Sequence, residues 1–470
     1  MNAPPHAGGG EPAPGAERGL LRGDRALLLL VVAAVCWRWL LAMRTPVPAE
    51  DGVNYLWMAQ RFAAGDAAAA LSEPFSPLWP LLLALPIAAG AEPFLAGQVL
   101  GCIAGGLALL PIAAIGERLR RGAGLPAAAL RAVSSVFART APEVLTEPLF
   151  VLVVGIAVAC GLAGRWWWLG VGTGLAFWVR PEGVLCALPF VLLWPSRAWR
   201  ALVGTAAAVA LLGAWRWLCG HGFDPVPKLQ FHALRTDLGD ERGDWLSNLL
   251  AVPPVFLEAF GGAALLAVLS LLPDRERAPD ADARRQWLVR QRLVPWLLLA
   301  CAVLPIATFV VRRRFFVAWA PAVLPLAGVT LARVVWLRGR ARELLLTAVC
   351  ALDLWTAWNG TIAADRRAER FVGRYLARVL PPGHTVVGDM TRVLWFAGQR
   401  PLPPRHFDAE WFLAAARAPE VEFVVMNERG QRGVFATVEQ GLRDAFVRFD
   451  LPVSLRAVAE ARGVTVFVRK

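Results

Sequence analysis

Two adjacent carboxylates, Glu50 and Asp51, follow the first long apolar segment of the chain and could act as a general base. They begin an amphipathic helical pattern that ends at Gly65. A carboxylate with an ordinary pKa of about 4 is a poor base until partial burial or a second carboxylate raises its pKa. General-base catalysis is worth about 10² to 10⁴ in rate. The alternative is that both acids simply start the helix, where the helix dipole favours negative charge, and the sequence leaves open which of the two would be the base.

Several basic residues near polar turns could bind a phosphate group. Three arginines are consecutive at the end of one apolar segment, and one of the only two lysines lies in a long polar loop. Guanidinium and ammonium groups stabilise negative charge that develops on a leaving phosphate. The alternatives are an anchor for lipid headgroups at the triplet and an interfacial position for Arg180. The candidate substrate contacts are Lys228, Arg312, Arg313, Arg314, Arg180, Arg139 and Tyr55.

Glu147 is the third candidate for acid–base chemistry, and it directly precedes Pro148. It could face a cavity, or it could cap a helix, because proline is favoured at the first helical position. Metal binding by His221, Asp224 and His232 is only weakly indicated, because three residues in one loop would have to carry it. The seven cysteines form no CxxC pair. We therefore expect no cofactor, with a divalent metal as an open alternative.

The composition is that of a polytopic membrane protein. Hydrophobic residues make up 57% of the chain and charged residues 18%, and the mean hydropathy is +0.49. Because a hydrocarbon core of roughly 30 Å needs about 20 apolar residues per helix, the apolar segments predict a mainly α bundle of about eleven spans. The net charge of +13 comes mostly from arginines in short loops, which indicates orientation in a membrane rather than binding of nucleic acid.

Placing the arginine-rich loops on the cytoplasmic side gives one consistent topology. Residues 1–23 then form a disordered cytoplasmic tail, and residues 24–358 form the transmembrane domain of a multi-pass protein of the inner or plasma membrane. Residues 44–93 become the first outer loop, in which 77–86 is too short and proline-rich for a span and is expected to lie along the outer surface. The arginine triplet also falls outside, against the positive-inside rule, which favours a functional role.

The last part of the chain, residues 359–470, is expected outside the membrane as an α/β domain. Its apolar runs alternate between the period of a strand and that of a helix. The predicted elements are strands at 384–389, 421–427 and 464–468, and helices near 408–417 and 434–448.

Short motifs add to the acidic pair and its glycine-terminated helix. They are Pro77-Leu78-Trp79, Thr146-Glu147-Pro148-Leu149-Phe150 and Val179-Arg180-Pro181-Glu182-Gly183. With these motifs the chain resembles the C-type glycosyltransferase (GT-C) superfamily, integral membrane enzymes that include protein O-mannosyltransferases and the aminoarabinose transferase of lipid A. One departure is Ser76, which stands before Pro77 where several relatives carry Lys or His. Another group must supply that cation, or the donor differs.

The resemblance implies transfer of a sugar, with inversion, from a polyprenyl-phosphate-linked donor to an extracytoplasmic glycolipid, polysaccharide or protein. It implies that Asp51 or Glu50 deprotonates the acceptor in a bacterial cell-envelope enzyme, with membrane lipid as a further partner. Two alternatives from other classes stay open. One is a transporter or lipid flippase, because Arg38, Arg131 and Arg216 lie in or near apolar segments. The other is a non-catalytic cell-envelope scaffold.

Overall fold

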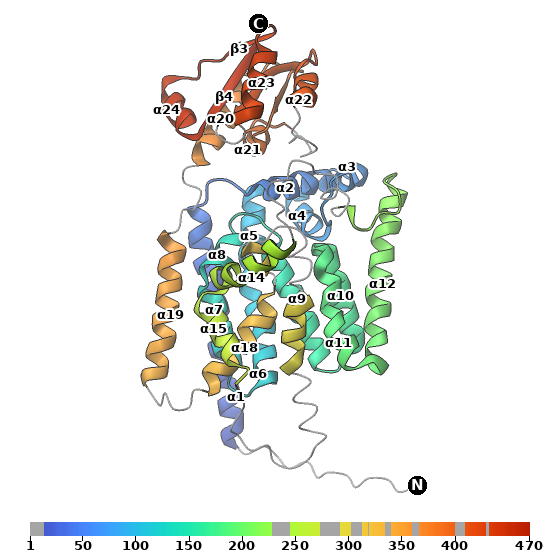
Figure 1. Cartoon of the computed structure of the whole chain (residues 1–470), viewed down its shortest axis with the longest axis vertical. Coiled ribbons are helices and arrows are strands. Elements are labelled where there is room, and N and C mark those ends of the chain that lie inside the picture. Colours follow the sequence, from blue (N-terminus) through green and yellow to red (C-terminus); the bar gives the residue numbers. More distant parts are fainter. Residues whose placement is uncertain are drawn as a thin grey trace.

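The protein is mainly helical and ends in a small mixed sheet (Figure 1). It is described here from a computed structural model, in which the helical part is a bundle of antiparallel helices and the C-terminal unit sits on one end of that bundle. The structure describes residues 14–227, 245–272, 292–301, 313–317, 319–333, 340–359, 366–399, 409–428 and 432–470. Of the tail that was expected to be disordered, residues 1–13 lie outside the described residues, whereas 14–23 are helical and belong to α1 (Pro14–Met43).

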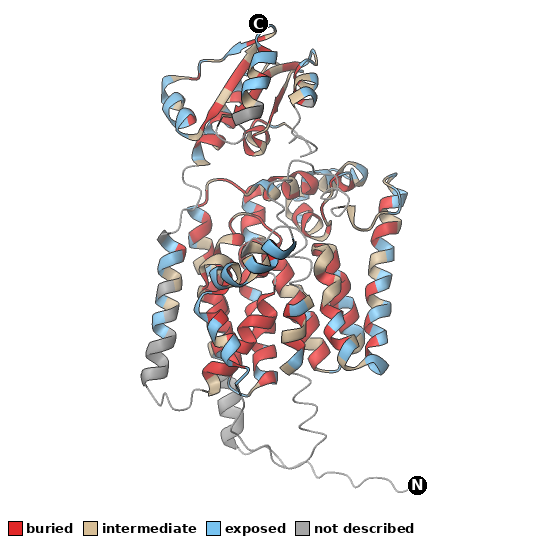
Figure 2. Cartoon of the chain, in the orientation of Figure 1, coloured by how far each residue is buried: buried red, intermediate tan, exposed pale blue. Residues whose placement is uncertain are grey.

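The bundle is built from apolar helices whose buried faces pack together. Figure 2 shows buried residues along its interior and exposed residues on its outside. Many of the exposed residues are large and apolar, the pattern expected where lipid is the solvent. Its helices are α1 (Pro14–Met43), α5 (Pro93–Leu107), α6 (Leu109–Leu119), α7 (Gly124–Val133), α8 (Ser135–Thr140), α9 (Glu147–Leu162), α10 (Trp166–Val179), the 3-10 helix η1 (Pro181–Ala187), α11 (Leu188–Leu193), α12 (Pro195–Leu218), α14 (Trp245–Phe260), α15 (Gly262–Leu269), α17 (Arg313–Val317), α18 (Ala320–Arg333) and α19 (Arg340–Asn359).

Three helices of the described residues are long and apolar enough to cross a membrane: Asp24–Met43, Pro93–Leu119 and Pro195–Leu218. Helices α14 and α15 would make a fourth span if the pair, bent by 110°, is counted as one. The other apolar helices are shorter, so the count of eleven spans stays a prediction. The apolar segment between Gly124 and Thr140 is divided between α7 and α8, because Ser134 between them leaves the helical conformation with φ −53° and ψ 124°.

Close helix contacts depend on small residues. A Cβ atom at Gly101 of α5 would lie 2.7 Å from the carbonyl oxygen of Ala141, and one at Gly170 of α10 would lie 2.8 Å from that of Ala201 on α12. Small residues at such positions let helix backbones approach, which is the usual basis of helix association in membranes.

Three short helices lie across one end of the bundle, here named the α2 end (Figure 1). They are α2 (Glu50–Ala63), α3 (Ala67–Leu71) and α4 (Leu78–Ala88). Helix α2 ends as the sequence predicts, because Gly65 adopts φ +78°, a conformation that favours glycine. The segment predicted as a surface helix forms α4, whose Trp79 is buried and donates its indole N–H to the Val144 carbonyl oxygen at 3.3 Å.

The C-terminal unit contains a four-stranded sheet of order β1-β2-β4-β3, with β1 and β2 parallel and the other pairs antiparallel. Alternate residues of β2 fill two cores: Phe423 and Val425 face one side of the sheet, and Val424 and Met426 face the other. The strands are β1 (Thr385–Gly388), β2 (Val421–Asn427), β3 (Phe446–Arg448) and β4 (Val464–Arg469), and the helices are α20 (Arg367–Val379), α21 (Thr391–Phe396), α22 (Ala409–Ala416), α23 (Arg432–Leu442) and α24 (Val453–Arg462).

Three strands lie where the sequence predicts them, whereas one helix prediction is wrong at its end. The helix expected over 434–448 stops at Leu442, and Phe446–Arg448 forms the edge strand β3. Phe446 is buried against the sheet, so tertiary packing decides its backbone conformation, which helical periodicity cannot indicate.

Candidate active site

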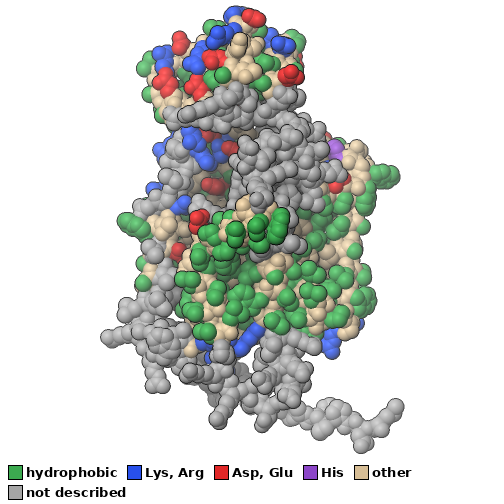
Figure 3. Space-filling view, viewed as in Figure 1, with side chains coloured by type: hydrophobic (Ala, Val, Ile, Leu, Met, Phe, Trp, Pro, Cys, Tyr) green, Lys and Arg blue, Asp and Glu red, His purple; other side chains and the backbone are tan. Residues whose placement is uncertain are grey.

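Four charged side chains meet at the α2 end of the bundle. Asp51 comes from the first turn of α2, Glu147 from the first turn of α9, Arg180 from the end of α10, and Arg314 from α17. Arg314 interacts electrostatically with all three of the others. We call these four residues the charge cluster. Figure 3 shows acidic and basic side chains between the apolar surface of the bundle and the C-terminal unit.

Arg180 joins two carboxylates. Its Nη1 lies 2.9 Å from Glu147 Oε1, and its Nε lies 2.5 Å from Glu182 Oε1. Helix α10 ends at Val179 because Arg180 adopts an extended backbone before Pro181, and this turn directs the guanidinium toward the start of the neighbouring α9. The Glu147 side chain is only 3% exposed, so its charge depends on Arg180 for compensation.

Asp51 pairs with Arg314. Asp51 Oδ2 lies 2.9 Å from Arg314 Nη1, and the two side chains are 29% and 35% exposed, respectively. The pair is therefore reachable from solvent, unlike Glu147. Of the other triplet residues, Arg313 has only its backbone described, in α17, and Arg312 lies outside the described residues, as does Lys228.

Tyr55 lies one helical turn after Asp51 and is 5% exposed. Its ring packs edge-on against Phe75, with ring centroids 5.2 Å apart. Burial raises the pKa of the Tyr55 hydroxyl, and the negative charges of Asp51 and Glu147 raise it further. Tyr55 therefore keeps its proton and can donate a hydrogen bond at the cluster.

Glu50 and Asp51 have different partners. Neighbouring residues on a helix point in different directions, and Glu50 Oε1 lies 3.4 Å from Arg392 Nη1 of the C-terminal unit. The Glu50 side chain is 71% exposed. Arg139 also has its own partner, because its Nη2 donates a hydrogen bond to the Thr356 carbonyl oxygen at 2.7 Å. The structure thus brings Asp51, Glu147, Arg180, Arg314 and Tyr55 together, and it places Glu50 and Arg139 in other contacts.

The turn before α9 fixes the start of α2. The Ala49 amide donates to the Glu143 carbonyl oxygen at 3.0 Å, and a Cβ atom at Gly52 would lie only 2.5 Å from that oxygen. Val144 adopts φ +60°, a strained conformation for a β-branched residue. Burial raises the pKa of the Glu143 carboxyl, while Arg366 and Arg392 oppose that shift. This strained turn therefore contacts the start of α2 and comes three residues before Glu147 in the chain.

Metal ligation was expected only as an alternative. Within the described part of the chain, no group of three His, Cys, Asp or Glu side chains could hold a metal ion. His221 Nε2 lies 2.7 Å from the Ala68 carbonyl oxygen, and Asp224 accepts a hydrogen bond from the Val226 amide. His232 lies outside the described residues.

The buried arginines of the bundle are held by backbone and rings. Arg38 donates to the carbonyl oxygens of Ala34 and Arg131, and Arg216 donates to that of Leu71. The Arg131 guanidinium lies over the ring of Phe137, 4.2 Å from its centroid. Asp224 also interacts electrostatically with Arg216, whereas the buried guanidinium nitrogens of Arg131 make no hydrogen bond within the described part of the chain.

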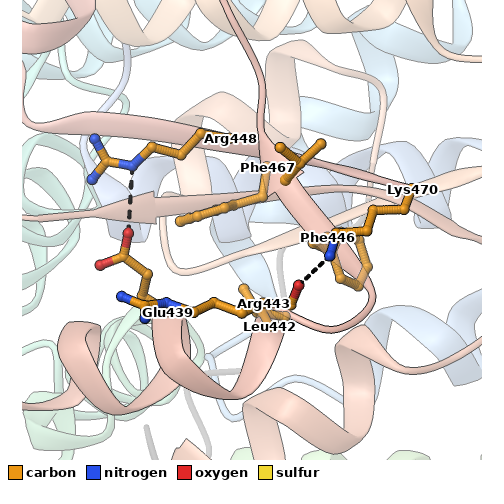
Figure 4. Close-up of a pocket in the computed structure, with 8 residues that line it drawn as sticks. Glu439, Leu442, Arg443, Phe446, Arg448, Phe467 and Lys470 are labelled. Carbon is orange, nitrogen blue, oxygen red and sulfur yellow. Dashed lines mark hydrogen bonds and ion pairs between the residues drawn. The ribbon is translucent and has the colours of Figure 1, made fainter.

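A cavity of about 250 Å³ lies in the C-terminal unit between α23 and the edge of the sheet (Figure 4). Two of its three cations have partners in the unit: Arg448 Nε lies 3.5 Å from Glu439 Oε1, and Lys470 Nζ donates to the Arg443 carbonyl oxygen. Its lining includes no residue of the charge cluster.

Arg392 and Glu369 also contact this end of the bundle or support that contact, and neither was predicted from the sequence. Arg392 lies in the first turn of α21, four residues after the carboxyl end of β1, the end at which open α/β sheets commonly place functional residues. That position was the one available signal, and it gives no indication that α2 is the partner.

Comparison with known proteins identifies solved structures with a similar fold. No protein-family model and no curated protein sequence matches the chain. Among solved structures, ArnT from Cupriavidus metallidurans bound to undecaprenyl phosphate aligns with a TM-score of 0.61 at 14% identity, over 94% of this chain and 97% of that one. The archaeal oligosaccharyltransferase AglB from Archaeoglobus fulgidus, in complex with an inhibitory peptide and a dolichol-phosphate, aligns with a TM-score of 0.58 at 12% identity, over 95% and 74%.

The arabinofuranosyltransferase AftD from Mycobacteria aligns with a TM-score of 0.53 at 16% identity, over 94% of this chain and 40% of that one. All three are GT-C glycosyltransferases, so the resemblance to that superfamily predicted from the sequence is confirmed as a resemblance of fold. With its apolar helices, the chain has the features of an integral membrane protein.

Proposed function

We propose that the protein is a glycosyltransferase that moves a sugar from a polyprenyl-phosphate-linked donor to an extracytoplasmic acceptor. The observation that carries this proposal is the ion pair between Asp51 and Arg314, beside Arg180. It puts a solvent-accessible carboxylate next to two fixed cations, in a fold whose solved members include complexes with undecaprenyl phosphate and a dolichol-phosphate. The acceptor would be a glycolipid, a polysaccharide or a protein.

In this mechanism Asp51 takes the proton from the acceptor hydroxyl or amine. The acceptor atom attacks the anomeric carbon of the sugar from the face opposite the phosphate, and the bond between that carbon and the phosphate oxygen breaks. The electron pair of that bond stays on the phosphate, which leaves as the polyprenyl phosphate. Inversion at the anomeric carbon follows, and general-base help of this kind is worth about 10² to 10⁴ in rate.

Arg314 and Arg180 would stabilise the leaving phosphate. Guanidinium groups bind phosphate oxygens through paired hydrogen bonds, and fixed cations at a developing negative charge lower the barrier without reorganisation. These arginines would also supply the cation that is missing at Ser76. Arg312, Arg313 and Lys228 remain candidates for the same role.

Binding of the donor would also free the base. Arg314 Nη1 lies 2.9 Å from Asp51 Oδ2, and a neighbouring guanidinium in general makes a carboxylate a weaker base. A phosphate that recruits the Arg314 guanidinium removes that partner, so Asp51 becomes a stronger base only when a donor is in place. Glu147 would act through Arg180, which it holds at 2.9 Å, and Tyr55 would donate a hydrogen bond to the donor.

Of the two acids, Asp51 is favoured as the base, because it pairs with Arg314 of the charge cluster, whereas Glu50 pairs with Arg392 of the C-terminal unit. In the proposed topology, the charge cluster and the C-terminal unit lie on the extracytoplasmic side of a bacterial inner membrane, and the N-terminus lies in the cytoplasm. The long polyprenyl chain would then lie in the bilayer beside the bundle.

The test compares Asp51→Asn with Glu50→Gln in sugar transfer from synthetic polyprenyl phosphate sugars, with the purified protein in proteoliposomes. We expect Asp51→Asn to lose transfer by about 10² to 10⁴ and Glu50→Gln to lose much less. Both variants should still bind undecaprenyl phosphate. Full activity of Asp51→Asn would overturn the assignment, and substrate uptake without any transfer by the wild type would favour a transporter.

A further inference from the structure

The C-terminal unit contacts the segment that directly precedes Asp51, the proposed base. Arg392 of α21 is the central contact, and its side chain is only 7% exposed. Its Nε donates to the carbonyl oxygen of Pro48 at 2.8 Å, and its Nη1 lies 3.4 Å from Glu50. One rigid guanidinium thus contacts both the entry to α2 and its first residue.

Arg392 is itself held in place by the C-terminal unit. Its Nη1 lies 2.9 Å from Glu369 Oε2 of α20, and the other oxygen of Glu369 accepts a hydrogen bond from Arg462 Nε of α24 at 3.2 Å. Glu369 is buried. Because Arg presents its donors in a planar fork, these contacts fix the direction in which Arg392 points.

Two further contacts join the same surfaces. Arg370 Nη1 donates to the Pro46 carbonyl oxygen at 3.2 Å, and Trp395 packs edge-on against Phe94 with ring centroids 6.4 Å apart. The start of α2 otherwise lacks a side-chain cap, because its N-cap residue is Ala49. The C-terminal unit therefore holds the segment that leads into α2 through its carbonyl oxygens, which is a different contact from a helix cap, because arginine can only donate.

We propose that Arg392 is a positioning residue for Asp51. The contacts of Arg392 with Pro48 and Glu50 are here named the joint, and Glu50 takes part in the joint and not in the chemistry. The inference rests on the proposed function. Asp51 follows Glu50 directly, so a shift of the first turn of α2 displaces its carboxylate from Arg314. A misplacement of about 1 Å caused by a change away from the chemistry can cost about 10²-fold in rate.

The joint is separable from the folding of the C-terminal unit. When Arg392 is replaced, Glu369 keeps Arg462 as a partner, and the buried neighbours Val393 and Leu394 stay in their core. A change at Arg392 should therefore loosen α2 while the unit stays folded.

The experiment compares Arg392→Gln and Arg392→Lys with Arg456→Gln, a control that removes an exposed ion pair with Asp450 in the same unit. We expect Arg392→Gln to lower kcat by about 10²-fold while the Kd for undecaprenyl phosphate stays within about twofold. Arg392→Lys should recover part of kcat, because an ammonium can replace one of the contacts. The double variant of Arg392→Gln with Glu50→Gln should be no slower than Arg392→Gln alone.

Amide hydrogen exchange of residues 49–56 gives a readout that does not depend on activity. We expect faster exchange there in Arg392→Gln than in the control, whether or not a donor has been found. Unchanged exchange in this segment, wild-type kcat, or an equal loss of lipid binding would overturn the inference. Absence of transfer by the wild type would instead count against the proposed function. The exchange result would still show whether Arg392 holds the start of α2.

Discussion

Removal of Arg180 should destabilise the protein more than removal of Arg180 together with Glu147. Arg180→Leu takes away the only cation that contacts Glu147 at hydrogen-bond distance among the described residues, and that carboxylate is 3% exposed. Breaking a buried ion pair from one side costs about 3 to 5 kcal/mol, because the remaining charge is uncompensated. Glu182 is partly exposed and can regain water, so we expect a value near 3 kcal/mol.

The double variant of Arg180→Leu and Glu147→Leu removes both charges from the site. Replacement of a whole buried pair by apolar residues is often neutral, so the double variant should recover most of the lost stability, with a coupling of about 2 kcal/mol or more. The assay is thermal unfolding in detergent followed by tryptophan fluorescence. We expect a clearly lower Tm for Arg180→Leu and a Tm near that of the wild type for the double variant.

The matched control is Arg118→Leu, an exposed arginine at the other end of the α5–α6 span. The Tm of this variant should change little, because an exposed charge contributes little to the free energy of unfolding. The reasoning is refuted if Arg180→Leu melts like the wild type, or if the effects of the two replacements simply add. Either result would mean that the Glu147 charge is compensated by other groups.

Two further predictions concern α2 and the C-terminal unit. Gly52→Ala should lower transfer and Tm together, because its Cβ would meet the Glu143 carbonyl oxygen at 2.5 Å; activity and Tm like those of the wild type would show that the turn can move. Burial raises the pKa of Asp389 to about 7, with Glu50 adding to it, so the folded state loses stability as pH rises from about 4 to about 7. Asp389→Asn should therefore melt higher than the wild type above pH 7 by a margin that narrows toward pH 4, and a margin independent of pH would contradict this.

Local signals in the sequence predicted the framework of the site. The 3.6-residue pattern and Gly65 gave the extent of α2, and the acids at its start were assigned correctly to its first turn. The alternation of apolar residues gave three of the four strands. The short edge strand β3 was missed because three residues carry too little pattern to distinguish a strand from the end of a helix.

Contacts between distant segments could not be predicted in the same way. Asp51 and Arg314 were each candidates, but their pairing depends on how α17 reaches the α2 end. The contact of Glu50 with Arg392 depends on docking of the C-terminal unit, which leaves no trace in local periodicity. Helix breaks such as the bend at Gly261, with φ +53°, likewise reflect packing, so apolar runs alone overstate regular spans.

The most direct test of the account is binding of undecaprenyl phosphate to the purified wild type and to Arg314→Gln, with Arg118→Gln as the control. A hydrogen bond to a charged group is worth about 1.5 to 3 kcal/mol, which corresponds to about 10- to 100-fold in Kd. We predict saturable binding that is weakened by that factor in Arg314→Gln and unchanged in the control. Equal affinity in wild type and Arg314→Gln, or no saturable binding by the wild type, would contradict the claim that Arg314 holds the donor phosphate beside Asp51.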